Sequence, residues 1–118
     1  MSHLVAIAST DGKFINEHFG RAKRFLIFEI NEGEPFKFLE LRDTTPACTP
    51  DGHHQDGLEQ AAELLKDCRA VLVSQIGPGA AAVLRQKGIE PLVRPNFIED
   101  ALVEYAGGEG NKQVNTAI

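Results

Sequence analysis

The chain has 118 residues, of which 42% are hydrophobic and 25% are charged, and its formal net charge is -5. A chain of this size can bury a core without disulfides or structural metals, so we expect one globular domain. The acidic balance argues against sequence-independent binding to nucleic acid or to anionic lipid, which relies on an excess of Lys and Arg. No apolar run approaches the roughly 20 residues of a membrane span, and residues 1–3 show no signal-peptide pattern. We therefore expect a cytoplasmic protein that binds neither membrane nor nucleic acid.

Apolar and turn-forming segments alternate in the first half of the chain. Residues 4–8 are apolar throughout, as in a central strand that is covered on both faces. Residues 25–30 and 36–41 are predicted strands, and the turn-forming residues 31–34 between them favour an antiparallel hairpin. The apolar residues of the later strand do not alternate cleanly, which predicts either a bulge or burial on both faces. Residues 42–57 contain two prolines and two glycines, and we expect a loop there.

The second half of the chain alternates between predicted helices and strands. Apolar side chains at helical spacing predict three helices, which begin near residues 58, 78 and 96. Two short apolar strands lie between these helices, at residues 70–73 and 89–93. Pro91 lacks a backbone donor and places the later strand at an edge of the sheet.

These elements predict an α/β fold in the order β-β-β-α-β-α-β-α. A hairpin followed by alternating strands and helices indicates a five-stranded mixed sheet with helices packed on it. The strand at residues 4–8 should pair in parallel with the strand at residues 70–73. We expect residues 1–107 to form the single domain and residues 108–118 to form a flexible tail.

Three connections are expected to meet at one rim of this sheet. Residues 11–21, which include His18, follow the carboxyl end of a central strand, and the turn at residues 77–79 follows another. The loop that contains Cys48 leads into the first helix, whose start should lie at the same rim. Ligands of such sheets tend to bind beyond the carboxyl ends of the parallel strands. The rim is therefore the candidate functional site.

The residues of the long connection leave two interpretations open. His18 is either a metal ligand or a brace that hydrogen-bonds to the backbone of its own loop. Arg21 belongs to a local basic cluster in an otherwise acidic chain. Such clusters are commonly solvated, but beside an anionic metal–sulfur cluster Arg21 would lower the electrostatic cost of binding.

Soft ligands are available in the neighbouring loop. Cys48 lies among polar residues and prolines, which favours reactivity or metal binding over packing. The adjacent residues His53 and His54 can place at most one imidazole well on a single ion. These residues do not complete a four-ligand zinc site, whereas thiolate with imidazole suits iron–sulfur, copper or zinc. Cys68 lies among core residues, and we expect it to serve packing.

The turn at Gly77 and Gly79 also has two interpretations. It either presents backbone N–H groups and the positive end of a helix to an anion, or it is only a tight turn that caps the helix. No nucleophile-elbow motif surrounds a serine, and the strands carry too few carboxylates for a two-metal nuclease. We therefore do not expect an enzyme.

Several segments of the chain are similar to one known family. They are residues 5–9, 16–22, 25–29, 67–68 and 74–77. Together they resemble the dinitrogenase iron-molybdenum cofactor biosynthesis family, which includes NifX-like proteins and the C-terminal domain of NifB. The likeness covers residues 4–106, and its most specific part is His18-Phe19-Gly20 followed by an aromatic strand. The resemblance implies a ribonuclease-H-like three-layer α/β fold and non-catalytic binding or carriage of a metal–sulfur cluster.

The resemblance also implies roles for individual residues. His18 matches the family's histidine and is the first candidate for a cluster ligand, and Cys48 falls where some relatives have a cysteine. His53 and His54 match no assigned position. The chain lacks a radical-SAM domain and a Cys-x3-Cys-x2-Cys motif, so we do not expect the cluster synthesis of full-length NifB.

The prediction is therefore a small carrier or chaperone of an iron–sulfur or molybdenum–iron–sulfur cluster. Some relatives hold a molybdenum–copper sulfide cluster instead. The expected partner is a protein that donates or accepts the cluster. The alternative is a regulatory or protein-interaction module in which the His18 loop is structural.

Overall fold

The computed structural model describes residues 2–31, 33–44, 48–49, 52–53 and 55–107 of the chain. Within residues 48–49, 52–53 and 55–56 the backbone alone is described. The predicted tail at residues 108–118 and one candidate ligand, His54, lie outside the described residues.

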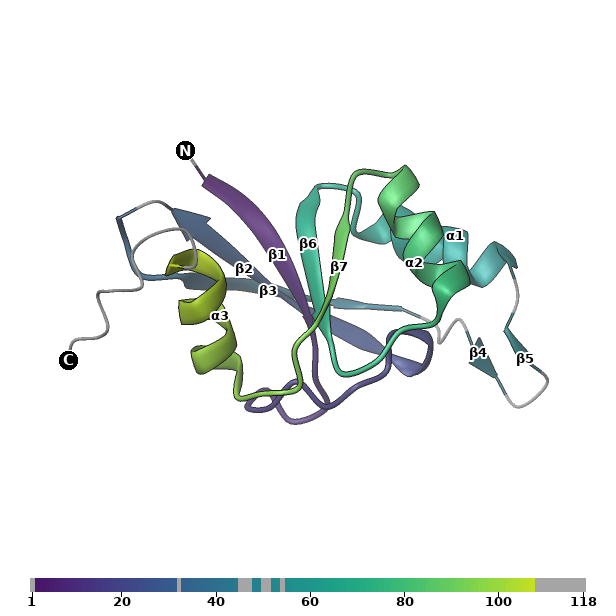
Figure 1. Ribbon diagram of the computed structural model, residues 1–118, viewed down its shortest axis with the longest axis horizontal. Helices are drawn as coiled ribbons and strands as arrows, with labels where there is room; N and C mark the ends of the chain where they lie inside the picture. The colour runs from purple at the N-terminus through teal and green to yellow at the C-terminus, as the bar shows by residue number, and fades with distance from the viewer. Residues whose placement is uncertain (1, 32, 45–47, 50–51, 54, 108–118) are drawn as a thin grey trace.

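The chain forms a mixed five-stranded sheet and three helices (Figure 1). The strands of the sheet are β1 (Ser2–Ala8), β2 (Arg24–Asn31), β3 (Lys37–Asp43), β6 (Cys68–Val73) and β7 (Glu90–Val93). The helices are α1 (Gln55–Leu64), α2 (Pro78–Gln86) and α3 (Ile98–Gly107). The predicted α/β class, with a five-stranded mixed sheet and three helices, is confirmed.

Two short elements were not predicted. A 3-10 helix, η1 (Phe19–Arg21), interrupts the connection between β1 and β2. A two-stranded ladder of β4 (Cys48–Thr49) and β5 (Gly52–His53) lies within the predicted loop at residues 42–57. The element order therefore differs from the predicted one by these additions, because strands of two residues are too short to show a period.

The sheet order is β3-β2-β1-β6-β7. As predicted, β1 pairs in parallel with β6, β2 and β3 form an antiparallel hairpin, and β7 lies at an edge. A register shift between Ile27 and Phe28 confirms the bulge. Burial of β3 on both faces is wrong, since Phe38 is 49% exposed and Leu41 is 50% exposed. This strand is the other edge of the sheet, and neighbouring elements leave its side chains open.

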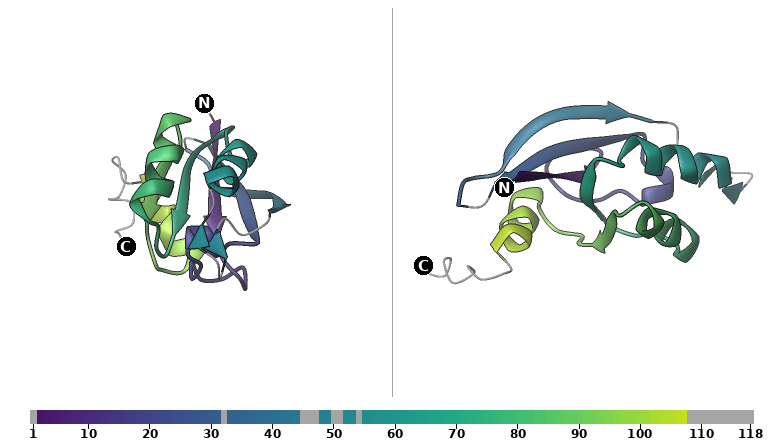
Figure 2. Two further views of the ribbon diagram at one scale, coloured as in Figure 1. Left: turned by 90° about the vertical axis from the view of Figure 1, so that its right-hand side faces the viewer. Right: turned by 90° about the horizontal axis from the view of Figure 1, so that it is seen from above.

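Alternate residues of the central strands belong to two apolar clusters. Ala6 and Ala8 of β1 belong to the cluster that α1 and α2 complete, whereas Val5 and Ile7 belong to the cluster that α3 completes. Figure 2 shows α1 and α2 packed together, away from α3. Among the helices that the structure describes, none has the length and apolar composition needed to cross a membrane.

Arg42 ties β3 to the connection between α1 and β6. Its Nη1 and Nη2 atoms donate to the two carboxylate oxygens of Asp67 at 2.7 and 2.9 Å. Nη1 also donates to the carbonyl of Leu64 at 2.9 Å, and Nε donates to Glu40 at 2.8 Å. The Arg42 side chain is only 17% exposed, so this two-pronged pair stabilises the fold more than an ordinary surface pair does.

Replacing Arg42 with Met should lower the free energy of unfolding at neutral pH by about 1–3 kcal/mol, because hydrogen bonds to charged groups are lost. The Arg42 guanidinium holds the pKa of the Asp67 carboxyl below its usual range. A folded-state pKa below the unfolded one stabilises the protein above the unfolded pKa, and that stabilisation disappears as pH falls through the folded pKa. Urea denaturation at neutral pH and at successively lower pH, through the range in which the Asp67 carboxyl becomes protonated, checks this. Arg42→Met should lose less stability over this range than the wild type, and equal losses would contradict the assignment.

Candidate functional site

The connection between β1 and β2 runs along the carboxyl ends of the parallel strands, as predicted (Figure 1). Its first half pairs with the segment that joins β7 to α3. The Ile15 N–H donates to the Asn96 carbonyl at 2.8 Å, and the Ile98 N–H donates to the Lys13 carbonyl at 2.8 Å. These two bonds fix the loop to the start of α3.

The second half of the connection pairs with the residues that follow β6. The Ser74 N–H donates to the Glu17 carbonyl at 3.0 Å, and the Phe19 N–H donates to the Gln75 carbonyl at 2.9 Å. His18 thereby forms a parallel bridge with Gln75, two residues before Gly77. The predicted meeting of the His18 loop with the Gly77 turn is confirmed. Gln75 contributes through its backbone carbonyl, and such a bond leaves no signal in the residue type.

Polar side chains brace the start of the connection. Ser9 is 3% exposed, and its Oγ donates to the Phe14 carbonyl at 2.6 Å and accepts from the Gly12 N–H at 3.0 Å. Asp11 Oδ1 accepts from the backbone N–H groups of Lys13 and Phe14 at 2.8 and 3.1 Å, and these bonds lower its pKa. Ser9 and Asp11 therefore stabilise the conformation of the loop. This structural role accounts for the presence of both side chains without catalysis or metal binding.

His18 is the N-cap residue of η1. Its Nδ1 accepts from the Gly20 N–H at 3.3 Å, so the lone pair of Nδ1 faces that donor. The proton of the neutral imidazole then lies on Nε2. Ligation of a metal through Nε2 requires that proton to leave, and a ring protonated at Nδ1 no longer accepts from Gly20. The bracing role that the sequence left open is present in the structure, and it competes with metal ligation.

Phe19 anchors this part of the loop in the core. Its side chain is 2% exposed, and its ring centroid lies 5.7 Å from that of Phe25 on β2. It belongs to the cluster beneath α1 and α2. Phe19 therefore anchors the segment that contains His18 and Arg21 to the core.

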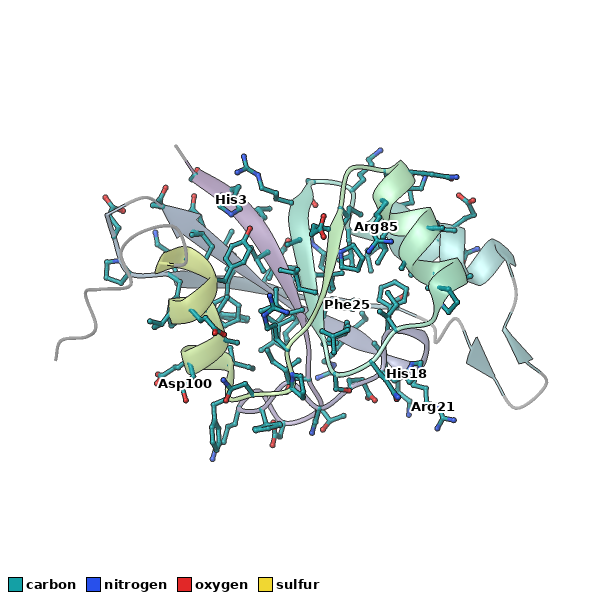
Figure 3. All side chains as sticks on the ribbon, in the orientation of Figure 1. His3, His18, Arg21, Phe25, Arg85 and Asp100 are labelled. Atoms are coloured by element: carbon teal, nitrogen blue, oxygen red, sulfur yellow. The ribbon has the colours of Figure 1, made fainter. Side chains whose placement is uncertain are left out.

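Arg21 is the exposed basic residue in the last turn of η1. It forms no ion pair with any residue that the structure describes, whereas Arg24 of the same basic cluster lies 3.5 Å from Asp43. Figure 3 shows His18 and Arg21 close to each other at the rim. Among the described residues of this part of the rim, the Arg21 guanidinium beside the His18 imidazole therefore contributes positive charge that no carboxylate pairs.

The start of α2 is open. Gly77 is the N-cap residue without a side-chain hydrogen bond, Pro78 occupies the first turn, and that turn contains no acidic residue. A Cβ atom added at Gly77 or Gly79 would meet nothing within 4 Å. The positive end of the helix is therefore accessible to an anion, and no packing contact requires either glycine.

The backbone of the Cys48 segment reaches the same rim. β4 contacts η1, and Cys48 lies opposite His53 in the ladder of β4 and β5. His54 lies outside the described residues. Across the described side chains, no three His, Cys, Asp or Glu residues gather as a metal site. The rim therefore brings together one described imidazole, one cation, one helix end and the backbone position of Cys48.

Cys68 is a packing residue, as predicted. It is a free cysteine, 3% exposed, within the cluster that α1 and α2 complete. Burial raises the pKa of its thiol to about 12. A thiol in this state is a poor nucleophile and a poor metal ligand at neutral pH.

Comparison of the sequence with known proteins identifies one family. A family model described as dinitrogenase iron-molybdenum cofactor matches residues 1–108. The chain is 36% identical to the FeMo cofactor biosynthesis protein NifB of Chlorobaculum tepidum over 110 residues, which is 93% of this chain and 25% of that protein. It is 35% identical to the protein NifY of Klebsiella pneumoniae over 89 residues, which is 75% of this chain and 37% of that protein. The chain thus spans a quarter of the one relative and rather more than a third of the other.

A solved structure shares the fold. The crystal structure of PH0822 superposes with a TM-score of 0.68 at 26% sequence identity, covering 89% of this chain and 91% of that chain. The sheet and helices described above are therefore found in a solved relative as well.

Proposed function

Because the chain belongs to the dinitrogenase iron-molybdenum cofactor family, we propose that it binds and carries a metal–sulfur cluster at the rim. The cargo is an iron–sulfur or molybdenum-containing cofactor precursor. The observation that carries this proposal is the meeting of His18, Arg21 and the open start of α2. His18 and Arg21 belong to the N-cap and last turn of η1, the helix end belongs to α2, and backbone hydrogen bonds join the η1 segment to the residues just before α2.

The chemistry of the rim fits such a cargo. Metal–sulfur clusters take thiolate and imidazole ligands, and they are commonly anionic. His18 supplies an imidazole, while Arg21 and the helix end near Gly77 and Gly79 supply positive potential and backbone donors. Cys48 is proposed as the thiolate ligand, and His53, its partner in the ladder, as a further imidazole. His54 stays a sequence-based candidate.

The hydrogen bond of His18 gives the proposal a mechanism of release. Ligation through Nε2 costs the bond between Nδ1 and the Gly20 N–H, and losing an N-cap bond costs about 0.5–2 kcal/mol. The cluster-free rim is thus stabilised by a bond that the loaded rim lacks. A carrier must release its cargo, and this competition together with few protein ligands favours release.

Several finer features belong to the same proposal. The protein acts without catalysis, in the cytoplasm, and exchanges the cluster with a donor or acceptor protein. A molybdenum–copper sulfide cluster is the variant cargo. The ribonuclease-H-like classification of the fold also remains a prediction from the resemblance.

Anaerobic loading tests the proposal. The purified protein is incubated with a donated iron–sulfur or molybdenum cluster, separated from excess donor, and measured for metal content and visible absorption. The wild type should retain cluster, and a His18→Ala, Cys48→Ala double variant should retain little. Equal retention by the two proteins would overturn the site.

Gly79→Ala probes the helix end separately. The substitution should raise the free energy of unfolding by about 0.5–1 kcal/mol, because Ala is favoured over Gly in a helix and the space is open. The same methyl group should lower cluster retention if the cargo approaches the start of α2. Thermal unfolding and metal analysis measure the two effects, and unchanged retention would remove this turn from the site. Gly88→Ala is not an equivalent control, because Gly88 has a φ of 81°.

A second function has one specific observation in its favour. The bond from Gly20 to His18 Nδ1 is what a purely structural loop would contain. In that case the domain is a regulatory or protein-interaction module without a cluster. It predicts that His18→Ala lowers thermal stability while metal content stays unchanged.

A further inference from the structure

An open cavity lies at the end of the sheet opposite the rim. Its volume is about 530 Å³, and its polar lining comes from the start of β6, the end of α2, the start of β7 and the last turns of α3. The side chains concerned are those of Arg69, Arg85, Glu90 and Tyr105. Figure 3 shows Arg85 toward the same end of the sheet as His3, whereas His18 and Arg21 lie at the other end. The cavity is thus separate from the proposed cluster site.

The two arginines of the cavity are exposed and form no ion pair with the residues that the structure describes. The neighbouring basic residue of α2 differs, because Lys87 lies 3.7 Å from Glu59 and 3.6 Å from Glu63. Among the described residues that line the cavity, two guanidinium groups thus outnumber one carboxylate, that of Glu90, and the net charge of the lining is positive.

The positive potential reaches the neighbouring ring pair. Tyr105 Oη lies 2.9 Å from His3 Nε2, and the two rings meet edge to face. Burial, and then the charge of Arg69, lower the pKa of His3. The ring pair therefore tends to stay uncharged, and the arginines are the cations that remain for a ligand.

We propose that this cavity binds a phosphate group through the guanidinium groups of Arg69 and Arg85. Guanidinium is planar and permanently charged, and it donates paired hydrogen bonds to oxyanions. Tyr105 adds a hydroxyl at the wall. The cavity is larger than an inorganic phosphate ion, so it has room for an organic group that carries the phosphate.

Glu90 adds selectivity to this site. Its carboxylate also lines the cavity and repels an anion that carries no proton. A monohydrogen phosphate has an O–H group that can donate to a carboxylate, whereas sulfate at neutral pH has none. The site should therefore prefer phosphate to sulfate, and Glu90→Gln should reduce that preference.

The cavity contains its own optical probe. Tyr105 is the only tyrosine of the chain, and the chain has no tryptophan. Cluster-free protein is titrated at constant ionic strength with inorganic phosphate, with glycerol 3-phosphate and with sulfate, and binding is followed by tyrosine fluorescence and by calorimetry. We expect saturable binding of phosphate. Tighter binding of glycerol 3-phosphate would identify a phosphorylated metabolite as the ligand, and weaker binding would identify the free ion.

Variants decide whether the cavity is the site. Arg69→Gln and Arg85→Gln should each weaken phosphate binding at least about tenfold, since each removes charge-assisted hydrogen bonds. Arg94→Gln, a matched change at an exposed arginine outside the cavity, should bind as the wild type does. Absence of saturable binding by both methods, or equal binding by all these variants, would overturn the proposal. His18→Asn should also bind phosphate normally, so this proposal and the cluster proposal can fail independently.

Discussion

Phe19→Ala is expected to lower the free energy of unfolding by about 3–5 kcal/mol, the largest stability effect that we predict. The Phe19 side chain is 2% exposed, and it packs near Phe25 in the core. Its removal leaves a cavity and releases η1 from the sheet. Thermal and urea unfolding measure the loss of stability.

A second phenylalanine provides the matched control. Phe97 packs edge to face on Phe14 but is 56% exposed, so Phe97→Ala removes the same atoms from a site open to water. We expect Phe97→Ala to cost about 1 kcal/mol or less, from the lost ring contact. Equal losses for the two variants would contradict the anchoring role of Phe19. If Phe19→Ala fails to fold, Phe19→Leu can replace it. Phe19→Leu should still lower the free energy of unfolding more than Phe97→Ala does, by a smaller margin.

Two substitutions of His18 are expected to separate bracing from ligation. His18→Ala removes the acceptor for the Gly20 N–H and should lower the free energy of unfolding by about 0.5–2 kcal/mol. His18→Asn places a preferred N-cap residue at the same position, so stability should stay within about 0.5 kcal/mol of the wild type. Thermal unfolding of the three proteins measures both effects.

Cluster retention by the same variants then gives the functional result. If His18 is a ligand, both variants should lose most of the cluster, because neither alanine nor an asparagine amide replaces an imidazole on a metal. If other residues hold the cluster and His18 only braces η1 beside them, His18→Asn should retain as much cluster as the wild type, and His18→Ala should retain less. If His18→Asn is as stable as the wild type and retains as much cluster, the ligand role of His18 is wrong.

The sequence was sufficient for the parts of the fold that depend on local patterns. Apolar runs identified the central strands, and Pro78 and Gly88 marked the ends of α2. The alternation of strands and helices after the hairpin gave the parallel pairing of β1 with β6. Each of these features follows from residue type, period or chain connectivity alone.

Other features depend on contacts between segments that no local pattern reveals. The β4–β5 ladder is too short to show a period. The exposed residues Phe38 and Leu41 look like core residues in sequence, but β3 lies at an edge where no element that the structure describes covers them. Of the two alternatives that the sequence left open for this strand, a bulge or burial on both faces, the structure contains the bulge.

The candidate site also combines features that the sequence predicts with features that depend on contacts between distant segments. Connectivity predicted that the connection at residues 11–21 and the Gly77 turn share a rim, and the bridge from His18 to Gln75 confirms this. The sequence left open whether His18 braces its own loop or binds a metal, and the bond from Gly20 to His18 Nδ1 became evident only from the backbone path of η1. The cavity that Arg69 and Arg85 both line was also missed, since the two residues come from different elements.

The most direct test of the central claim is to detect the nitrogen of His18 on the bound metal. The protein is loaded anaerobically with a cluster in a paramagnetic state, and pulsed electron paramagnetic resonance measures nitrogen hyperfine coupling. We predict the coupling of a ligating imidazole, and we predict that it persists when His53 and His54 are both replaced by alanine. A loaded wild-type protein without this coupling, or a coupling lost only in the His53→Ala, His54→Ala variant, would contradict the proposal that His18 holds the cluster.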